Sequence, residues 1–395
     1  MMDLADLFDG STAVKPPLDE AALRAIPAKR GIFLLVAADG RPILLTTAAD
    51  IRSRLRFRLS APEEDDKRHK TADLREITAS IHWRLTHSHF QTDWQFLEIA
   101  RRIWPDSYAR LLPRRMAWFV VPRVQDPAPH LAITSEPGGD ERHFGPFAGR
   151  RSAEEFIDAL ADVFDLCRCI SVLRKAPLGQ ACAYKQIGRC SAPCDGSGSM
   201  EDYRRLVAQA VEFAAGSRTA QREILTARMR QAAEARQFER AGVLKSRLER
   251  AAAFDGEKFA HVGDVTQFTF VIIQPGPSFH QACSFVCVRG QLAEGPILEF
   301  PPTNEAAAQV LEACDRLTGE DVADDLARRR MTLVASYMLN DPDRRGLILP
   351  REVVTVEELA ARIIAAAEVL HLREKRKKAG GGRLEAGGTA GTTGS

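Results

Sequence analysis

The stretch CAYKQIGRCSAPCDGSGSMEDYRRLVAQAVEFAAGS, residues 182–217, decides how the rest of the chain is divided. Its first part holds Cys182, Cys190 and Cys194, and its second part, from Glu201 onward, has an almost purely helical pattern. An amphipathic helix is predicted over 152–166 and leads directly into the cysteines. We therefore interpret the cysteine segment as a linker between a folded unit before it and a helical region after it.

Composition places the chain among ordinary globular proteins. Of 395 residues, 45% are hydrophobic and 27% are charged, which excludes disorder of the whole chain and favours two to four domains of roughly 100 to 200 residues each. The 55 Lys and Arg almost balance the 53 Asp and Glu, so nucleic-acid affinity must come from local basic patches. No apolar run approaches the ~18 residues that cross a bilayer, and the first residues are acidic, which predicts a cytoplasmic protein without membrane contact.

The cysteine segment has the composition of a metal site. Five of the eight cysteines fall between 167 and 194, and in a reducing cytosol such a cluster indicates a metal rather than disulfides. Thiolates are soft ligands that suit iron-sulfur clusters and zinc, and the absence of paired C-x2-C spacing favours a cluster. The alternative is a set of buried, inert thiols, and the polar residues around them argue against it. Cys167 is spare in this interpretation.

Hydrophobic periodicity predicts an α+β multidomain fold. Strands are expected over 31–37, 42–46, 81–87 and 116–121, helices over 49–59 and 89–104, β structure over 265–300, and helices over 304–317 and 321–338. The expected divisions are an N-terminal arm (1–28), a small α/β domain (29–125), a segment with a helix and the cysteines (126–200), a helical region (201–256), a small α+β domain (257–350), a C-terminal helix (351–378) and a disordered tail (379–395).

Two apolar stripes mark the helical region. Ile224, Leu225 and Met229 lie on the first, and Phe238 and Leu244 lie on the second, so two short antiparallel helices are expected. A helix pair of this size cannot bury both stripes alone, which indicates a helical partner. The alternative is a hairpin that packs onto its own neighbours.

The run from Cys182 to Ser217 resembles a region of bacterial UvrC, the nuclease subunit of the UvrABC excision-repair system. That region reads approximately C-x2-YQIGRC-x-APC, followed by a Glu-x-Tyr helix, and Lys185-Gln186 stand here for its Tyr-Gln. The resemblance implies a site for a 4Fe-4S cluster, or for zinc, on four ligands: Cys169, Cys182, Cys190 and Cys194.

Residues 229–251 are similar to the UVR motif of the same family, a helical hairpin that docks on a matching hairpin of UvrB. Gly242 replaces an Ala of the motif, at a cost of about 1 kcal/mol in a helix interior. The resemblance implies that UvrB is a partner and that it contacts Met229, Phe238, Glu239, Ala241, Leu244 and Leu248.

The first domain resembles the GIY-YIG nuclease domain of UvrC, with departures. Phe33 stands at the first Tyr and Leu44 at the second, while Arg54 holds the catalytic Arg position and Glu98 the glutamate that binds Mg²⁺ or Mn²⁺. Losing a general base costs about 100- to 10,000-fold in rate, so a residual or inactive nuclease is favoured over an efficient one. Arg54 and Glu98 also have an ordinary interpretation as surface residues of amphipathic helices.

The densest basic segment is expected to contact DNA phosphates without reading sequence, although a solvated charged face is the alternative. Its arginines are Arg101, Arg102, Arg110, Arg114 and Arg115.

These resemblances together imply a UvrC-like nucleotide-excision-repair protein that acts with UvrB on damaged DNA. We expect the family's RNase H-like nuclease and helix-hairpin-helix modules to be missing. Two alternatives stay open: an active single-incision endonuclease of the UvrC/Cho type with divergent catalytic residues, and a non-enzymatic regulator that occupies UvrB or DNA. The sequence does not indicate an oligomeric state.

Overall fold

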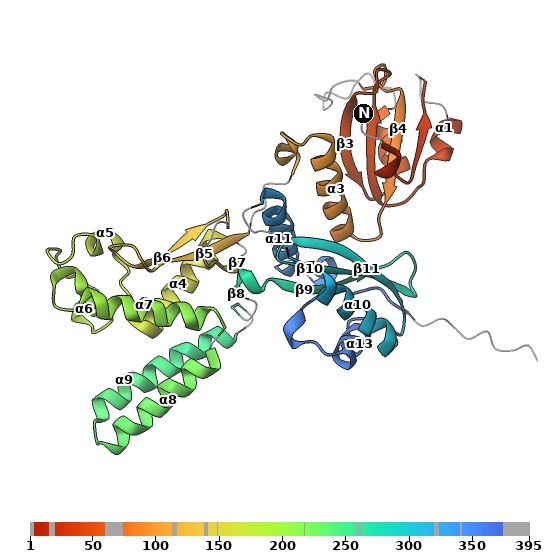
Figure 1. Ribbon diagram of the computed structural model, residues 1–395. Helices are drawn as coiled ribbons and strands as arrows, with labels where there is room; N and C mark the ends of the chain where they lie inside the picture. Colours follow the sequence, from red (N-terminus) through yellow and green to blue (C-terminus); the bar gives the residue numbers. More distant parts are fainter. Residues whose placement is uncertain are drawn as a thin grey trace, which may run out of the picture.

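The computed structural model describes residues 4–15, 20–59, 74–112, 117–137, 141–147, 149–216, 218–256, 258–259, 262–319, 324–339 and 342–373. Within them the chain forms three four-stranded antiparallel sheets and a projecting helix pair (Figure 1). The α+β multidomain prediction is therefore confirmed. None of the described helices has the length and apolar character needed to span a lipid bilayer.

The N-terminal domain is a sheet of order β1-β4-β2-β3 with helices on both faces. Alternation along the central strand β2 explains the layers, because Phe33 packs against Leu55 of α2 on one face, and Ile32 packs near Leu97 of α3 on the other. Its elements are η1 (Leu4–Asp6), β1 (Gly10–Ala13), α1 (Glu20–Ala25), β2 (Gly31–Val36), β3 (Pro42–Ala48), α2 (Ile51–Leu59), β4 (Ser80–Leu85), α3 (His89–Ile103) and η2 (Tyr108–Leu111).

Residues 1–28, expected to be an arm, form part of this domain where they are described. β1 pairs with β4, and Gly10 lies opposite Trp83, where an added Cβ would come within 2.7 Å of the indole ring. Phe8 and Ile26 are buried in the two cores that flank the sheet. A four-residue strand has too little alternation to be recognised from sequence, and only its pairing with β4 reveals it.

The middle domain packs a sheet of order β6-β5-β7-β8 against α4 and α7. β5, expected to close the first domain, belongs to this sheet instead, and it pairs with strand β7. Its elements are β5 (Trp118–Arg123), β6 (His130–Thr134), β7 (Phe144–Phe147), α4 (Arg150–Phe164), α5 (Ile170–Leu173), α6 (Ala183–Gln186), η3 (Pro193–Asp195), α7 (Met200–Ala214) and β8 (Gly263–Asp264).

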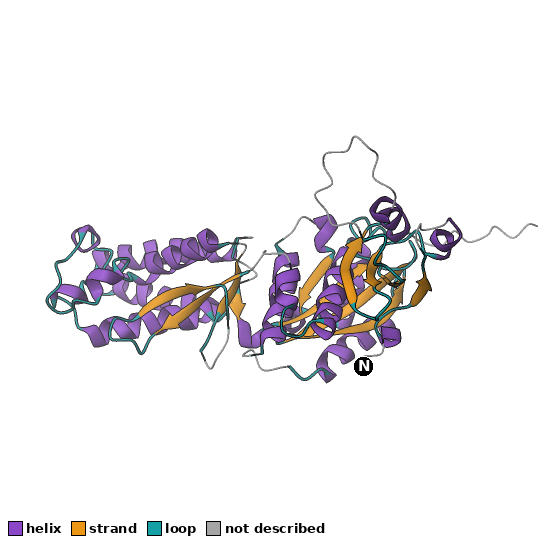
Figure 2. Ribbon diagram, turned by 90° about the horizontal axis from the view of Figure 1, so that it is seen from above, coloured by secondary structure: helices purple, strands orange, loops and turns teal. Residues whose placement is uncertain are grey.

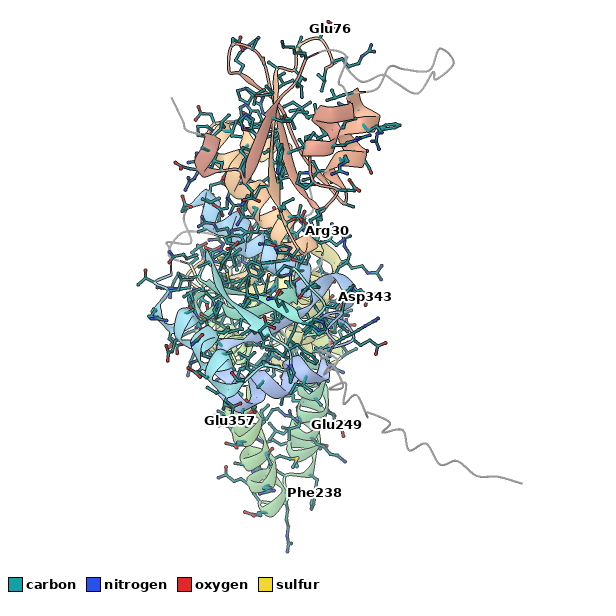
Figure 3. All side chains as sticks on the ribbon, turned by 90° about the vertical axis from the view of Figure 1, so that its right-hand side faces the viewer. Arg30, Glu76, Phe238, Glu249, Asp343 and Glu357 are labelled. Carbon is teal, nitrogen blue, oxygen red and sulfur yellow. The ribbon has the colours of Figure 1, made fainter. Side chains whose placement is uncertain are left out.

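Three helices, rather than the expected two, follow the cysteines. α7 packs into the middle domain through Tyr203 and Val207. α8 (Arg218–Glu234) and α9 (Phe238–Ala251) then form an antiparallel pair, which is followed by η4 (Ala252–Asp255). The pair projects from the body of the molecule, and Phe238 lies at its free tip (Figures 1 and 3).

The C-terminal domain has a sheet of order β11-β10-β9-β12, with α10 and α13 on one face and α11 on the other. The predicted helices 304–317 and 321–338 correspond to α10 and α11, whereas the last helix, expected to reach 378, ends at Ala365. Residues from 374 onward lie outside the described part of the chain. The elements of the C-terminal domain are η5 (Val265–Gln267), β9 (Thr269–Pro275), β10 (Gln281–Val288), β11 (Gln291–Glu299), α10 (Asn304–Arg316), α11 (Asp325–Met338), α12 (Pro342–Arg345), β12 (Leu347–Pro350), η6 (Arg351–Val353) and α13 (Val356–Ala365).

Figure 2 shows how the three domains are arranged in space. The N-terminal and C-terminal domains lie together on one side, and the middle domain with its helix pair extends to the other. Helix α3 of the first domain lies against the C-terminal domain, although about 230 residues separate its Glu98 from the Arg330 that it contacts.

We expect Phe254→Ala to destabilise the middle domain by about 3–5 kcal/mol, from lost burial and the cavity that it leaves. Phe254 is fully buried, and its ring centroid lies 5.0 Å from that of Phe213 and 5.4 Å from that of Phe156. Urea unfolding followed by circular dichroism measures the change. Phe238→Ala, at a side chain 71% exposed, is the control and should change stability by at most about 0.5 kcal/mol. Equal shifts for the two variants would contradict the assigned core.

Candidate functional site

The four predicted cysteine ligands lie on or beside short helical elements of the middle domain. Cys169 immediately precedes α5, Cys182 immediately precedes α6, and Cys194 lies within η3. The chain turns sharply between Cys190 and Cys194, where Ala192 has a left-handed backbone with φ of 53°. The side chains of Cys169 and Cys182 interact, as do those of Cys190 and Cys167. Cys167, spare in the sequence interpretation, thus lies beside Cys190.

Hydrogen bonds make the thiols of this cluster unequal. The thiol of Cys167 donates to Cys190 and lowers the pKa of Cys190 to about 6, and the Ala192 N–H adds a second donor 3.4 Å from its Sγ. The same bond, together with burial, raises the pKa of Cys167. Burial also raises the pKa of Cys194. One thiolate at Cys190 is thus stabilised before any metal binds.

Neighbouring side chains fix the loop that carries the thiols. The Tyr203 hydroxyl accepts the Cys167 N–H at 3.1 Å, and Lys185 binds Asp195 at 2.8 Å, which lowers the pKa of Asp195 to about 2. Tyr203 is the Tyr of the Glu-x-Tyr pattern, and it is buried on α7. The helix after the cysteines therefore positions them.

The donor set suits a thiolate-bound metal chemically, because cysteine sulfurs are soft ligands. Electrostatic interactions connect Cys169 with Cys182, Cys190 and Cys194. Across the described residues, however, no three His, Cys, Asp or Glu side chains form a group arranged to hold a metal ion.

The structure does not bring the three nuclease candidates together. Phe33 is fully buried in β2, on the face of the sheet covered by α2. Arg54 is exposed on α2. Glu98 lies on α3, which covers the opposite face. The sheet therefore separates Glu98 from the helix that carries Arg54.

Both carboxylate oxygens of Glu98 already bind side chains of this chain. Arg330 of α11 donates its Nε to Oε1 at 2.7 Å and its Nη2 to Oε2 at 3.0 Å, and Trp94 Nε1 donates to Oε1 at 2.9 Å. The Glu98 and Arg330 side chains are 25% and 12% exposed. A divalent ion on Glu98 would have to displace a bidentate guanidinium, so this carboxylate does not fit the predicted metal role. Sequence reasoning had no way to find Arg330, because nothing local pairs residues so far apart.

Two of the five predicted DNA-contacting arginines are displayed as expected. Arg102 and Arg110 are exposed and form no ion pair within the described residues. The Arg101 guanidinium instead lies over the Tyr108 ring, 5.4 Å from its centroid. Arg114 and Arg115 fall in 113–116, outside the described residues.

The helix pair uses most of its predicted contact residues internally. Leu244 is buried, and Met229, Ala241 and Leu248 pack around it in a seam shared by α8 and α9. The two stripes therefore face each other in the free chain, and the assignment of these residues as partner contacts stays a prediction. Phe238 and Glu239 are exposed, as predicted, and Val243, which the sequence analysis missed, is 53% exposed.

Comparison with known proteins identifies the segment that carries the cysteines. Residues 116–213, from β5 to the end of α7, match the family model for the middle domain of the UvrC/Cho excinuclease. The resemblance expected from the cysteine run is therefore confirmed. No solved structure matches the chain significantly.

Similar curated proteins agree with this match. The chain is 28% identical over 276 residues to UvrABC system protein C of Sphingopyxis alaskensis, covering 66% of this chain and 41% of the relative. It is 26% identical over 338 residues to the protein of that name from Saccharopolyspora erythraea, covering 84% and 45%, and 30% identical over 237 residues to that from Anaeromyxobacter dehalogenans, covering 58% and 32%. The chain thus spans less than half the length of these relatives.

Proposed function

We propose that this UvrC-related chain works in nucleotide-excision repair as a protein that docks on UvrB at damaged DNA, and that its N-terminal domain is not an efficient nuclease. The observation that carries the proposal is the projecting α8–α9 pair, which directly follows the UvrC/Cho middle domain and exposes Phe238 at its tip. A role on chromosomal DNA implies a cytoplasmic location.

The base of the helix pair is anchored, so its tip is presented in a fixed direction. Arg218 at the start of α8 donates to the carbonyls of Phe254 at 2.9 Å and Val262 at 2.7 Å. Arg247 of α9 forms an ion pair with Asp165, just after α4. A preorganised helix pair loses less conformational entropy when it binds, which favours docking through the residues left exposed.

The exposed apolar residues of the pair define the docking surface of this proposal. Phe238 is 71% exposed, Val243 is 53% exposed and Ile224 is 44% exposed, whereas the rest of the apolar stripe is used between the two helices. Aromatic side chains at such tips commonly carry much of the binding energy of an interface.

We expect Phe238→Ala to weaken binding to UvrB at least about tenfold, because it removes the largest exposed apolar side chain of the pair. Titration calorimetry with purified UvrB measures the dissociation constant. Phe279→Ala, at a side chain 64% exposed on the C-terminal domain, is the matched control and should bind like the unchanged chain. An unaltered dissociation constant for Phe238→Ala would refute docking through the tip.

The same middle domain is proposed to hold an iron-sulfur cluster, or zinc, on Cys169, Cys182, Cys190 and Cys194. The match of residues 116–213 to the UvrC/Cho middle domain and the presence of these four free cysteines within it support this proposal. When bound, the group would cross-link short segments that have little core of their own.

Protein purified without oxygen is expected to contain iron and acid-labile sulfide, and Cys194→Ser should lose both, because a thiolate ligand is removed. Elemental analysis and visible absorption measure the content. Cys314→Ser, at a buried cysteine of α10, is the control and should keep it. Zinc without sulfide would keep the site and exclude the cluster, and metal retained in Cys194→Ser would contradict the ligand set.

DNA contact is assigned to the exposed arginines at the end of α3 and in η2. Arg102 and Arg110 are exposed, and contacts to phosphate need only cationic side chains on the surface. Arg114 and Arg115 complete this proposal from the segment between η2 and β5.

The N-terminal domain should not cut DNA efficiently, because Phe33 has no hydroxyl and Glu98 is bound by Arg330. With UvrA, UvrB, ATP and Mg²⁺ or Mn²⁺, we expect no incision near a bulky lesion above the level of a Glu98→Gln variant, measured on end-labelled duplex. Cleavage that disappears in Glu98→Gln would instead establish the alternative, a single-incision endonuclease of the UvrC/Cho type.

A further inference from the structure

One face of α3 is shared with the C-terminal domain. Phe90, Trp94 and Glu98 follow each other at four-residue spacing, so they lie on one side of the helix, and we refer to them as the α3 stripe. All three contact residues of the C-terminal domain. The residue that aligns with a metal ligand is thus the last member of an interdomain contact surface.

The first two members of the α3 stripe are part of the core of the other domain. The Phe90 ring lies edge-on to Phe285 of β10 and to Tyr337 of α11, at 5.3 Å in each case, and Trp94 lies 5.7 Å from Phe285. Phe90, Phe285 and Met331 are almost completely buried in one cluster. A domain interface this apolar and well packed resembles a protein interior more than a transient contact.

Polar pairs close the same interface around that core. Tyr337 donates its hydroxyl hydrogen to Asp93 Oδ2 at 2.6 Å, and burial raises the pKa of Tyr337. Tyr108 donates to Asp325, which Arg329 also binds at 2.8 Å. Although burial opposes it, hydrogen bonding by Arg329 and Tyr108 lowers the pKa of Asp325.

Each of these polar contacts except the Arg329–Asp325 pair crosses from one domain to the other. Gln95 of α3 adds another by donating to Glu294 of β11 at 3.2 Å. The ion pair between Glu98 and Arg330 is largely enclosed, since the two side chains are 25% and 12% exposed.

We propose that Arg330, and not a metal ion, is the positive charge that binds Glu98. We further propose that the α3–α11 contact, called the joint below, is a stable domain interface that fixes the N-terminal domain to the C-terminal domain. Arg330 supplies both the positive charge and two directional hydrogen bonds that a half-buried carboxylate needs. An ion that replaced it would have to break a largely enclosed ion pair and both of its hydrogen bonds, which is costly. This joint is independent of UvrB docking, because the α8–α9 pair takes no part in it.

A double-mutant cycle tests the joint in the full-length chain by native-state hydrogen exchange. Glu98→Gln and Arg330→Gln should each speed exchange in both α3 and α11 by about tenfold, because each removes the ion pair that links the two helices. The double variant should be no faster than either single one, since the same ion pair can be lost only once. Glu312→Gln and Arg316→Gln, from a pair 65% and 74% exposed on α10, are the controls and should leave α3 and α11 unchanged.

If the double variant speeds exchange by the product of the two single-variant factors, the two residues are not coupled and the proposal is wrong. Faster exchange in only one of the two helices would also contradict it. Manganese binding gives a second test, which does not depend on exchange rates. Titration with Mn²⁺ followed by electron paramagnetic resonance should give the same isotherm for the unaltered chain and Glu98→Gln. A Mn²⁺ site lost only in Glu98→Gln would show that Glu98 binds the metal and not Arg330. Neither measurement contains UvrB, so failure here leaves the docking proposal standing.

Discussion

The packing of Phe90 and Trp94 against Phe285 is the contact on which the arrangement of the two outer domains depends. It makes α3 a helix with two buried faces, one against its own sheet and one against the C-terminal domain. Such a helix cannot leave either partner without exposing aromatic surface to water, which would cost several kcal/mol. The side chains of the α3 stripe, including Glu98, are therefore held against the C-terminal domain.

Glu98 and Phe33, two residues that the sequence analysis considered for a nuclease site, both serve the fold in this structure. A carboxylate that resembles a metal ligand receives a bidentate guanidinium instead, while Phe33, at the position of a catalytic hydroxyl, is closed into the core. At both positions the side chain is used for packing or ion pairing within the fold, whereas a nuclease needs groups there that meet water and phosphate. This arrangement agrees with a docking role better than with catalysis.

The middle domain presents two different surfaces from a single core. Tyr203 holds the backbone at Cys167, and Phe254, at the end of the helix pair, packs against Phe213 of the same α7 helix. The cysteine cluster and the α8–α9 pair are therefore tied to one helix by buried side chains.

The sequence by itself determined what depends on near neighbours. Period-two and period-3.6 patterns located most strands and helices to within a few residues, and the run from Cys182 to Ser217 indicated the cysteine cluster and its family. Only the tertiary structure decided which faces meet. It placed β1 beside β4, turned Leu244 and Met229 inward against each other, and gave Glu98 a partner 232 residues away. The physical reason is that burial and ion pairing depend on what lies opposite a side chain, and a one-dimensional pattern records which face is apolar but not what covers it.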